Sequence, residues 1–375
     1  MQRRLYTIGI LILAALCMVA CAESITLAPS APPTMPVMDN QESGSAAGET
    51  IILPPPSPPP VPKSENAIPL ILSHDGAPDD IATMVYLSNH PDIDVIGVIQ
   101  SYGEQRPTRS LNAWQRFLYE TLEYDSVPIG VGSITPLDPA GNQFPPTWRA
   151  GADDFWGVPL PEAESEYTHY NGVELIIHLL SNASKPVTLL VTGAQTDIAL
   201  ALQQDPTIKD QIAQIVIMGG AFNVPGNLGE ASGYGNNTVA EWNIFVDPLA
   251  AKQVFNAGIP ITVVSLDGSD ELLIGPADLE SIASSTAPGL DVLLALWERS
   301  LSWSGGPFKI WDIVAAVAVT HPQHFTWEYG ALDVIAEPGS SHGQTIALRT
   351  GSSIARYSFS TNYDAVRDVV FEILK

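Results

Sequence analysis

Cysteine is almost absent from this sequence. Of its 375 residues only Cys17 and Cys21 are cysteines, and both lie in or at the end of an apolar segment near the amino terminus. Disulfide bonds therefore cannot stabilise a domain built from the remaining chain. Such a domain must depend on its hydrophobic core and on any bound ion, which a chain with 45% hydrophobic residues can do.

Positive charge is also scarce. Lys and Arg number 16 against 41 Asp and Glu, which gives a formal net charge of -25. Proteins bind nucleic-acid backbones by neutralising phosphates with Lys and Arg, so this balance argues against a nucleic-acid polymer as a partner. A divalent metal ion or a small neutral or cationic ligand fits the acidity better.

The first 21 residues are typical of an export signal. Arg3 and Arg4 precede an apolar run at residues 5–20, which is too short for a comfortable transmembrane span. The run leads into MVAC at residues 18–21, which resembles the processing signal of bacterial lipoproteins. We expect an exported, extracytoplasmic protein held at the cell membrane by a lipid on Cys21. An ordinary secretory signal with an incidental cysteine is the alternative.

Residues 22–66 are rich in Pro, Ser, Ala and Gly, and they include two runs of three prolines at residues 54–56 and 58–60. Such a stretch buries too little apolar surface to offset its ordering entropy. We interpret it as a disordered, partly extended tether that holds the following domain away from the membrane.

Residues 67–375 alternate between short apolar runs and amphipathic stretches, with no repeat at a fixed period. Buried strands are predicted at residues 93–100, 127–130, 187–191, 214–218 and 261–266, and helices at residues 109–122, 173–180, 197–204 and 247–257. Further helices are predicted at residues 277–302, 312–320 and 366–374, with short strands at residues 333–335, 345–349 and 354–358. The alternation predicts a single α/β domain, with an open, mostly parallel central sheet flanked by helices.

Three carboxylates fall within six positions after an apolar run at residues 68–72: Asp75, Asp79 and Asp80. Like charges so close raise one another's pKa unless a cation or hydrogen-bond donors compensate. Asp79 and Asp80 alone would equally suit the first turn of a helix. Asp75 does not help a helix in that way, and it suits an oxygen-ligand site for calcium or magnesium. The carboxyl end of a strand is also where open α/β sheets bind ligands.

A second polar group lies in the segment at residues 224–248. If Glu241, Trp242 and Asn243 are extended, the acid and the amide share one face and the tryptophan occupies the other. An acid beside an amide can hold sugar hydroxyls. A plain structural role fits Asp247, which we expect to cap a helix that begins at Pro248.

Two tryptophans precede charged residues, Trp311 before Asp312 and Trp148 before Arg149. Asp312 stands at the start of an apolar stretch, where it could be a helix N-cap. Trp148 lies in a loop rich in Pro and Gly, where aromatic side chains often only pack. Neither pair identifies a site by itself.

In this order, the segments resemble the inosine-uridine preferring nucleoside hydrolase family from about residue 68 to the carboxyl end. SHDGAPDD at residues 73–80 matches the family's opening signature DxDxxxDD in all but its first acid. VTGAQTDIA, IVIMGG, AEWNIFVDP and the late WD pair are similar to further family landmarks. The resemblance implies a nucleoside hydrolase-like, Rossmann-like open sheet, and the HDG, VPGN and AEWN segments look most like the purine-preferring inosine-adenosine-guanosine branch.

The resemblance also implies a calcium ion bound by the carboxylates of Asp75, Asp80 and Asp312 and by the main-chain carbonyl of Thr192. Asp75 would accept the proton of a water that the ion activates. Breaking an N-glycosidic bond builds positive charge on the ribose, so a pocket rich in carboxylates favours the transition state over the neutral substrate.

Substrate contacts follow from the same resemblance. Asp79 and Asn243 would hold the 2′ and 3′ hydroxyls of the ribose, and Asn227 and Glu241 would lie near the 5′ hydroxyl. The stretch around Asn227 is longer than the family pattern, so Asn236 or Asn237 could take its place. Trp311 and Trp148 would stack on the base.

The sequence departs from the family at two positions. Ser73 replaces the first acid, and Ala77 occupies a turn where the purine branch can carry a polar side chain. We expect Ser73 to lie outside the ligand set and His74 to be packing. Tyr102 and Glu104 fall where the family places polar residues near the pocket, and their role is open.

The sequence therefore predicts an N-ribohydrolase that uses calcium to cleave ribonucleosides, purines preferred, into free base and ribose. One alternative is a broad or pyrimidine-preferring hydrolase. Another is a non-catalytic nucleoside-binding lipoprotein, motivated by Ser73 and Ala77. The expected partner is a small ribonucleoside, and the oligomeric state, a homo-oligomer included, is open.

Overall fold

The structure, a computed structural model, describes residues 51–53, 58–164, 166–229, 232–348 and 355–375. The expected export signal with Cys17 and Cys21, and most of the expected tether, lie outside these residues. No helix within the described ranges is long and apolar enough to cross a membrane. Just before the domain, the Lys63 ammonium donates hydrogen bonds to the carbonyls of Ser88 and His90 at 2.8 and 3.1 Å.

In the part of the chain that the structure describes, nine strands form one sheet in the order β10-β13-β7-β6-β5-β1-β2-β3-β4. These strands are β1 (Ile68–His74), β2 (Ile93–Gln100), β3 (Ile129–Val131), β4 (Tyr170–Asn171), β5 (Val187–Thr192), β6 (Ile212–Met218), β7 (Ile261–Val264), β10 (Phe325–Tyr329) and β13 (Ala355–Thr361). All neighbouring strands are parallel except β10 and β13. The predicted α/β fold with a mostly parallel sheet is confirmed.

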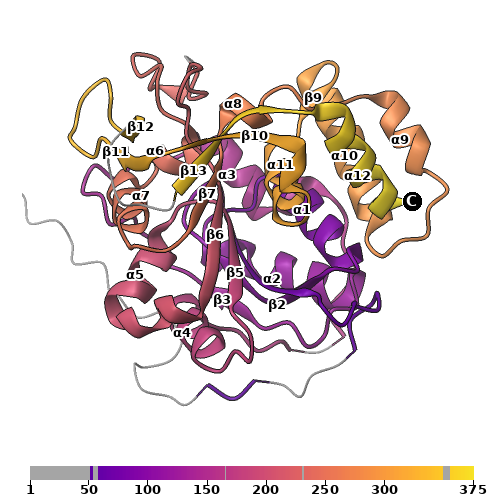
Figure 1. Cartoon of the computed structure of the whole chain (residues 1–375). Coiled ribbons are helices and arrows are strands. Elements are labelled where there is room, and N and C mark those ends of the chain that lie inside the picture. Colours follow the sequence, from indigo (N-terminus) through magenta and orange to yellow (C-terminus); the bar gives the residue numbers. More distant parts are fainter. Residues whose placement is uncertain (1–50, 54–57, 165, 230–231, 349–354) are drawn as a thin grey trace, which may run out of the picture. The chain divides into compact units, whose positions relative to one another are not determined.

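Helices cover both faces of the sheet, as Figure 1 shows. One layer contains α1 (Pro78–Asn89), α2 (Pro107–Arg116), α10 (Leu290–Ser304), α11 (Trp311–Thr320) and α12 (Tyr363–Leu374). The other contains α4 (Gly172–Ser181), α5 (Thr196–Gln204) and α7 (Pro248–Phe255). The central strand β1 serves both layers because its side chains alternate: Leu70 and Leu72 pack in the first core and Ile71 in the second.

Shorter elements complete the domain. The helices among them are α3 (Pro146–Asp153), α6 (Trp242–Phe245), α8 (Leu266–Ser269) and α9 (Pro276–Ile282), with helical turns at Phe117–Thr121, Phe155–Gly157, Pro206–Gln211 and Pro322–His324. Two small hairpins pair β8 (Leu273–Ile274) with β9 (Phe308–Lys309) and β11 (Ala331–Val334) with β12 (Thr345–Leu348).

Two of the predicted helices are interrupted. The stretch at residues 277–302 divides into α9 and α10, because Pro288 and Gly289 stand inside it and Gly289 has a φ of 79°. The stretch at residues 109–122 is α-helical only to Arg116, and a π-helical turn continues it to Thr121. Neither change affects the arrangement of the sheet.

The sheet reverses its direction of growth between β1 and β5. The chain adds β2, β3 and β4 on one side of β1, and then β5, β6 and β7 on the other. In the register of these strands, His74 at the end of β1 is paired with Gln100 of β2 and Thr192 of β5. Asp75 therefore follows β1 at the switch point, where open α/β sheets bind their ligands.

Candidate active site

A cavity of about 1240 Å³ lies at this edge of the sheet. Asp75, Asp79 and Asp312 line it together with Thr192, Glu241 and Asn243. Asn227, Trp148 and Trp311 also lie on its wall. The structure thus brings together residues that are far apart in the sequence, whereas the predicted metal ligand Asp80 is not on the wall.

Asp80 lies behind the cavity and is fully buried. Its carboxylate accepts hydrogen bonds from the N–H of Ala77 at 2.9 Å, the N–H of Asp75 at 3.2 Å and the hydroxyl of Thr192 at 2.6 Å. Burial and the charge of Asp79 raise the pKa of Asp80 to about 7, against the lowering effect of the Thr192 and Ala77 bonds. Asp80 thereby fixes the turn that carries Asp75.

Asp75 is positioned by two glycines that the sequence analysis did not single out. A Cβ at Gly103 would lie 2.1 Å from Oδ2 of Asp75, and one at Gly193 would lie 2.7 Å from its Cβ. The N–H of Glu104 donates to Oδ2 at 3.0 Å. Burial, followed by the charges of Asp80 and Glu104, raises the pKa of Asp75 well above its ordinary value. The signal for these glycines was their place just after β2 and β5.

Three more buried carboxylates share the cavity. Asp79 accepts the N–H of Asp312 at 3.2 Å, which joins the start of α1 to the start of α11. Burial is the first cause that raises the pKa of Asp79, Glu104 and Asp312, and the charges of Asp79 and Asp80 raise the pKa of the last two further. No Lys, Arg or His of the described ranges forms an ion pair with these groups.

The donor set is the kind that calcium prefers, because it consists of carboxylate and carbonyl oxygens. The only lysine on the wall, Lys309, pairs with Asp270 at 2.6 Å. Within the described residues the acidic and histidine side chains do not already form a three-ligand cage. Oxygens of Asp75, Asp79 and Asp80 accept hydrogen bonds from neighbouring N–H and hydroxyl groups.

The segment around Glu241 differs from the prediction, because Glu241, Trp242 and Asn243 are not extended. Residues Trp242–Phe245 form α6, and Glu241 is its N-cap, accepting the N–H groups of Asn243 at 3.0 Å and Gly220 at 2.9 Å. Burial raises the pKa of Glu241 to about 7. Glu241 and Asn243 still reach the cavity wall, since α6 starts there.

The amide of Asn243 donates to the carbonyls of Thr192 at 3.3 Å and Met218 at 3.2 Å. Asn227 accepts the N–H of Trp242 at 3.1 Å through its side-chain oxygen. Neither Asn236 nor Asn237 lies on the cavity wall, so the structure offers Asn227 rather than these two for a ribose contact.

Asp247 caps α7, as predicted, by accepting the N–H of Ala250 at 3.1 Å. The predicted N-cap role of Asp312 is wrong, because α11 begins at Trp311 with Ile310 as its N-cap. Asp312 therefore sits in the first turn of α11.

Trp311 and Trp148, the two aromatic residues expected to stack on a base, both line the cavity. The indole N–H of Trp311 donates to Asp270 at 3.0 Å, and the Lys309 ammonium lies 5.7 Å from its ring centroid. Trp148 is 40% exposed, and its ring centroid lies 6.0 Å from that of Trp242. Asp270 was not anticipated from the sequence, because only the fold brings the end of α8 next to β9.

The remaining sequence expectations concern residues beside the site. Ser73 is buried and does not line the cavity, whereas Ala77 does. His74 packs in the interior, as predicted. Its side chain is fully buried, and its ring centroid lies 3.8 Å from that of Trp114. Burial lowers the pKa of His74 to about 3. Glu104 lies on the wall, and Tyr102 lies behind it, donating its hydroxyl to the carbonyl of Asn142 at 2.8 Å.

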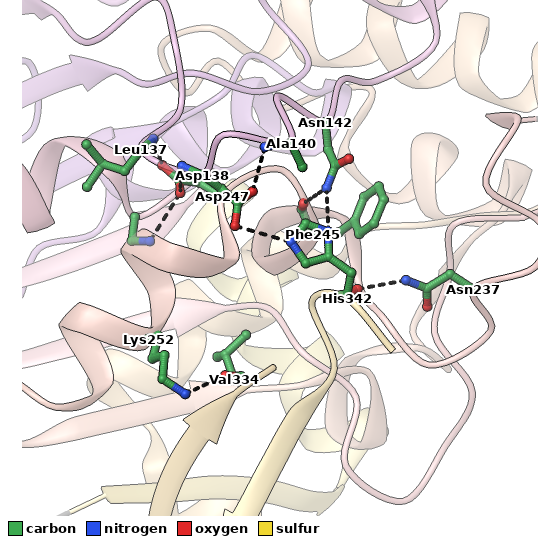
Figure 2. Close-up of polar contacts among 11 residues, drawn as sticks. Leu137, Asp138, Ala140, Asn142, Asn237, Phe245, Asp247, Lys252, Val334 and His342 are labelled. Carbon is green, nitrogen blue, oxygen red and sulfur yellow. Dashed lines mark hydrogen bonds and ion pairs between the residues drawn. The ribbon is translucent and has the colours of Figure 1, made fainter. Parts of the chain in front are cut away.

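A buried polar network supports the loop that precedes Trp148 (Figure 2). His342 contacts Asp138 through Nε2 at 3.2 Å and the amide of Asn142 through Nδ1 at 3.1 Å. The Asn142 amide also donates to the carbonyl of Phe245 at 2.8 Å, and the Asn237 amide donates to the carbonyl of His342 at 2.7 Å. The network thus ties the loop after β3 to α6 and to the β11–β12 hairpin.

Fold and site together define an α/β enzyme whose cavity is lined by buried carboxylates and by aromatic rings. The chain belongs to the inosine-uridine preferring nucleoside hydrolase family, whose model matches residues 70–371. This match confirms the resemblance seen in the sequence and includes every residue of the candidate site. The protein is a nucleoside hydrolase, that is, an N-ribohydrolase.

Two relatives in sequence carry names that specify pyrimidine nucleosides. The pyrimidine-specific ribonucleoside hydrolase RihA of Klebsiella pneumoniae is 32% identical over 75% of this chain and 88% of its own length. RihA of Salmonella arizonae is 36% identical over 63% of this chain and 72% of its own length.

Solved structures share the fold. A purine-preferring ribonucleoside hydrolase from Gardnerella vaginalis matches with a TM-score of 0.69 and 23% identity, covering 82% of this chain and 98% of its own. The inosine-uridine preferring nucleoside hydrolase from Bacillus anthracis matches with a TM-score of 0.68 and 23% identity, covering 82% of this chain and 99% of its own.

Proposed function

We propose that this nucleoside hydrolase depends on calcium and prefers purine ribonucleosides, which it cleaves to free base and ribose. One observation carries the proposal: buried carboxylates without a basic partner and two tryptophans line a single cavity. The carboxylates suit a cation and a sugar, and the tryptophan rings suit a flat base.

Asp75, Asp80 and Asp312, with the carbonyl of Thr192, are the residues that would hold the ion. Bound there, calcium would fix the sugar hydroxyls and lower the pKa of a coordinated water. The support is the donor set itself, since buried carboxylates without cationic neighbours raise one another's pKa and gain most from a positive charge.

The protein's own groups account for the remaining chemistry. Asp75 follows β1 directly, lies on the cavity wall and accepts the proton of the attacking water. Asp79 and Asn243 hold the 2′ and 3′ hydroxyls, and Asn227 and Glu241 hold the 5′ end. As the glycosidic bond breaks, positive charge develops on the ribose, and the fixed carboxylates stabilise that charge more than they stabilise the neutral substrate.

The preference for purines rests on the aromatic side of the cavity. Trp148 and Trp311 offer two ring faces, and no histidine of the described ranges lies on the wall to protonate a leaving base. A purine nucleoside carries a basic imidazole nitrogen that can take a proton from solvent, and an indole face stabilises this protonated nucleoside before the bond breaks and the base departs neutral. Stacking contributes about 1–3 kcal/mol per base, which is enough to select a base.

A broad or pyrimidine-preferring hydrolase is the second candidate, because two relatives that are 32% and 36% identical to this chain are named pyrimidine-specific. A panel of inosine, adenosine, guanosine, uridine and cytidine, assayed with calcium and after its removal, separates the two. Faster release of uracil than of hypoxanthine would overturn the purine preference. Equal rates after complete removal of calcium would overturn the metal requirement.

We also propose an exported protein with its lipid anchor on Cys21, supported by the basic and apolar residues before it. Labelled fatty acid should enter the native protein, and Cys21→Ala should abolish both labelling and membrane retention. Membrane retention without labelling in the native protein would overturn the anchor.

A further inference from the structure

The cavity is larger than a nucleoside requires. Its volume of about 1240 Å³ exceeds the range of roughly 300–1,000 Å³ that encloses a drug-sized ligand. The residues assigned to ribose and base leave part of the wall unused. This part includes Trp156 and Trp303, which we call the tryptophan shelf.

Trp156 is held in an unusual backbone conformation. Phe155, Trp156 and Gly157 have φ values of 49°, 55° and 67°, so two bulky residues in a row adopt the left-handed region. Such strain persists only where surrounding contacts determine it, and it clusters at functional sites.

Two contacts fix the Trp156 indole. Its N–H donates to the carbonyl of Gly76 at 2.9 Å, directly beside Asp75. Its ring packs on Gly151, where a Cβ would lie 2.7 Å from the nearest ring carbon. The strained backbone therefore presents a rigid aromatic surface next to the catalytic turn.

Trp303 supplies the second half of the shelf. It lies in the last turn of α10 with 54% of its surface exposed, and its ring centroid lies 5.5 Å from that of Trp156 at an interplanar angle of 51°. A half-exposed tryptophan on a cavity wall keeps ring surface that is not buried in the folded protein and can contact a ligand.

The shelf belongs to the base side of the cavity. The Trp156 ring packs on Gly151 of α3, the helix that also carries Trp148, and Trp303 lies against Trp156. The ribose contacts are assigned instead to the first turn of α1, to α6 and to the loop before it. A ligand group that reaches the shelf is therefore an extension of the base.

The charges on the wall limit the chemistry of that extension. Asp154, Asp267, Asp270 and Glu271 lie on this wall, and Lys309 is already paired with Asp270. A phosphate would be repelled by these acids. An uncharged aromatic group is favoured, since it stacks on indole rings.

We propose that the tryptophan shelf is an outer subsite for an aromatic substituent on the exocyclic amine of the base, so that ribonucleosides with an N-benzyl group on that amine are substrates. The inference rests on the proposed function, because it takes the base to lie between Trp148 and Trp311. The shelf itself makes no contact with the reacting bond and determines specificity only.

The test compares kcat/KM for N6-benzyladenosine with that for adenosine, and for N4-benzylcytidine with that for cytidine, in the native protein. Trp303→Ala should lower the benzyl-to-plain ratio about tenfold, the effect of losing one stacking partner. Trp303→Phe should keep most of the ratio. Phe359→Ala removes an aromatic ring that is 47% exposed on β13 and absent from the cavity wall, and it should leave the ratio unchanged.

An unchanged ratio in Trp303→Ala, or rejection of both benzyl substrates by the native protein, would overturn the shelf. Turnover of the plain nucleosides in the same assay reports the proposed function separately. If no plain nucleoside is hydrolysed, the proposed function fails. The subsite is then tested by calorimetry, as the ratio of the dissociation constants of the benzyl and plain nucleosides, which should change about tenfold between the native protein and Trp303→Ala.

Discussion

Replacing Thr192 by Val tests the electrostatics of the buried acids, because the substitution removes a hydroxyl group and leaves the shape of the side chain almost unchanged. The Thr192 hydroxyl donates to Oδ1 of Asp80 at 2.6 Å, and both residues are buried. In Thr192→Val the Asp80 carboxylate loses this hydroxyl donor, and a buried strand accepts Val without strain.

The cost should depend on pH. A hydrogen bond to a charged group is worth about 1.5–3 kcal/mol and one between neutral groups about 0.5–1.5 kcal/mol. The pKa of Asp80 is raised to about 7, so Asp80 is mostly protonated near pH 5 and mostly ionised near pH 8. Losing a donor that favours the charged form raises this pKa further. The variant should therefore lose about 1 kcal/mol of unfolding free energy near pH 5 and about 2 kcal/mol near pH 8, without added metal.

Urea unfolding of calcium-free protein at the two pH values measures this difference. Thr188→Val is the matched control, because Thr188 is buried on the same strand and its hydroxyl has no hydrogen bond in the described structure. Equal losses in the two variants near pH 8, or a loss in Thr192→Val that shrinks as pH rises, would refute the assignment of the Thr192 hydroxyl to an ionisable Asp80.

Three further predictions concern catalysis and binding. Asp75→Asn keeps the shape of the turn but removes the proton acceptor, so turnover should fall about 10²–10⁴-fold with an unchanged circular dichroism spectrum; near-normal turnover would remove Asp75 from its role. Burial raises the folded-state pKa of Asp75, Asp80 and Asp312, so the calcium-free protein should lose stability as pH rises from about 4 through about 7. Calcium should therefore raise the melting temperature more near pH 8 than near pH 5. An equal rise in melting temperature at both pH values would contradict this. His342→Ala breaks the network under the Trp148 loop and should raise KM severalfold with a smaller change in kcat, whereas His169→Ala, at an exposed position, should change neither.

The fold was largely predictable because its signals are local. Parallel strands buried on both faces are continuous runs of Ile and Val, as in β2 and β6, and they stand out against amphipathic helices. The acids after β1 were predictable as a site because Asp75 precedes the helix and does not stabilise its first turn. A carboxylate that does not stabilise local structure is expected to act in a site formed by the tertiary fold.

The parts that escaped prediction depend on contacts across the fold. Glu241 reads as part of an extended segment, yet it caps a helix of four residues because Gly220, after β6, donates a second N–H to it. The place of Trp156 depends on the carbonyl of Gly76 and on the open face of Gly151. No sequence pattern encodes partners that lie 80 residues away, and only the sheet order brings them together.

The arrangement of helix ends explains how so many acids can share one cavity before any ion binds. Asp79 and Asp80 lie in the first turn of α1, and Asp312 lies in the first turn of α11. Both helices are long enough to place partial positive charge at their amino ends, and both begin at the cavity. Glu241 receives N–H groups at the start of α6 in the same way. Asp75 precedes α1 and Glu104 precedes α2, and neither lies inside a helical turn. Asp75 has no helix end behind it and receives, among the described residues, a single N–H group, that of Glu104, so a cation should be attracted strongly beside Asp75, where we propose that the water is activated.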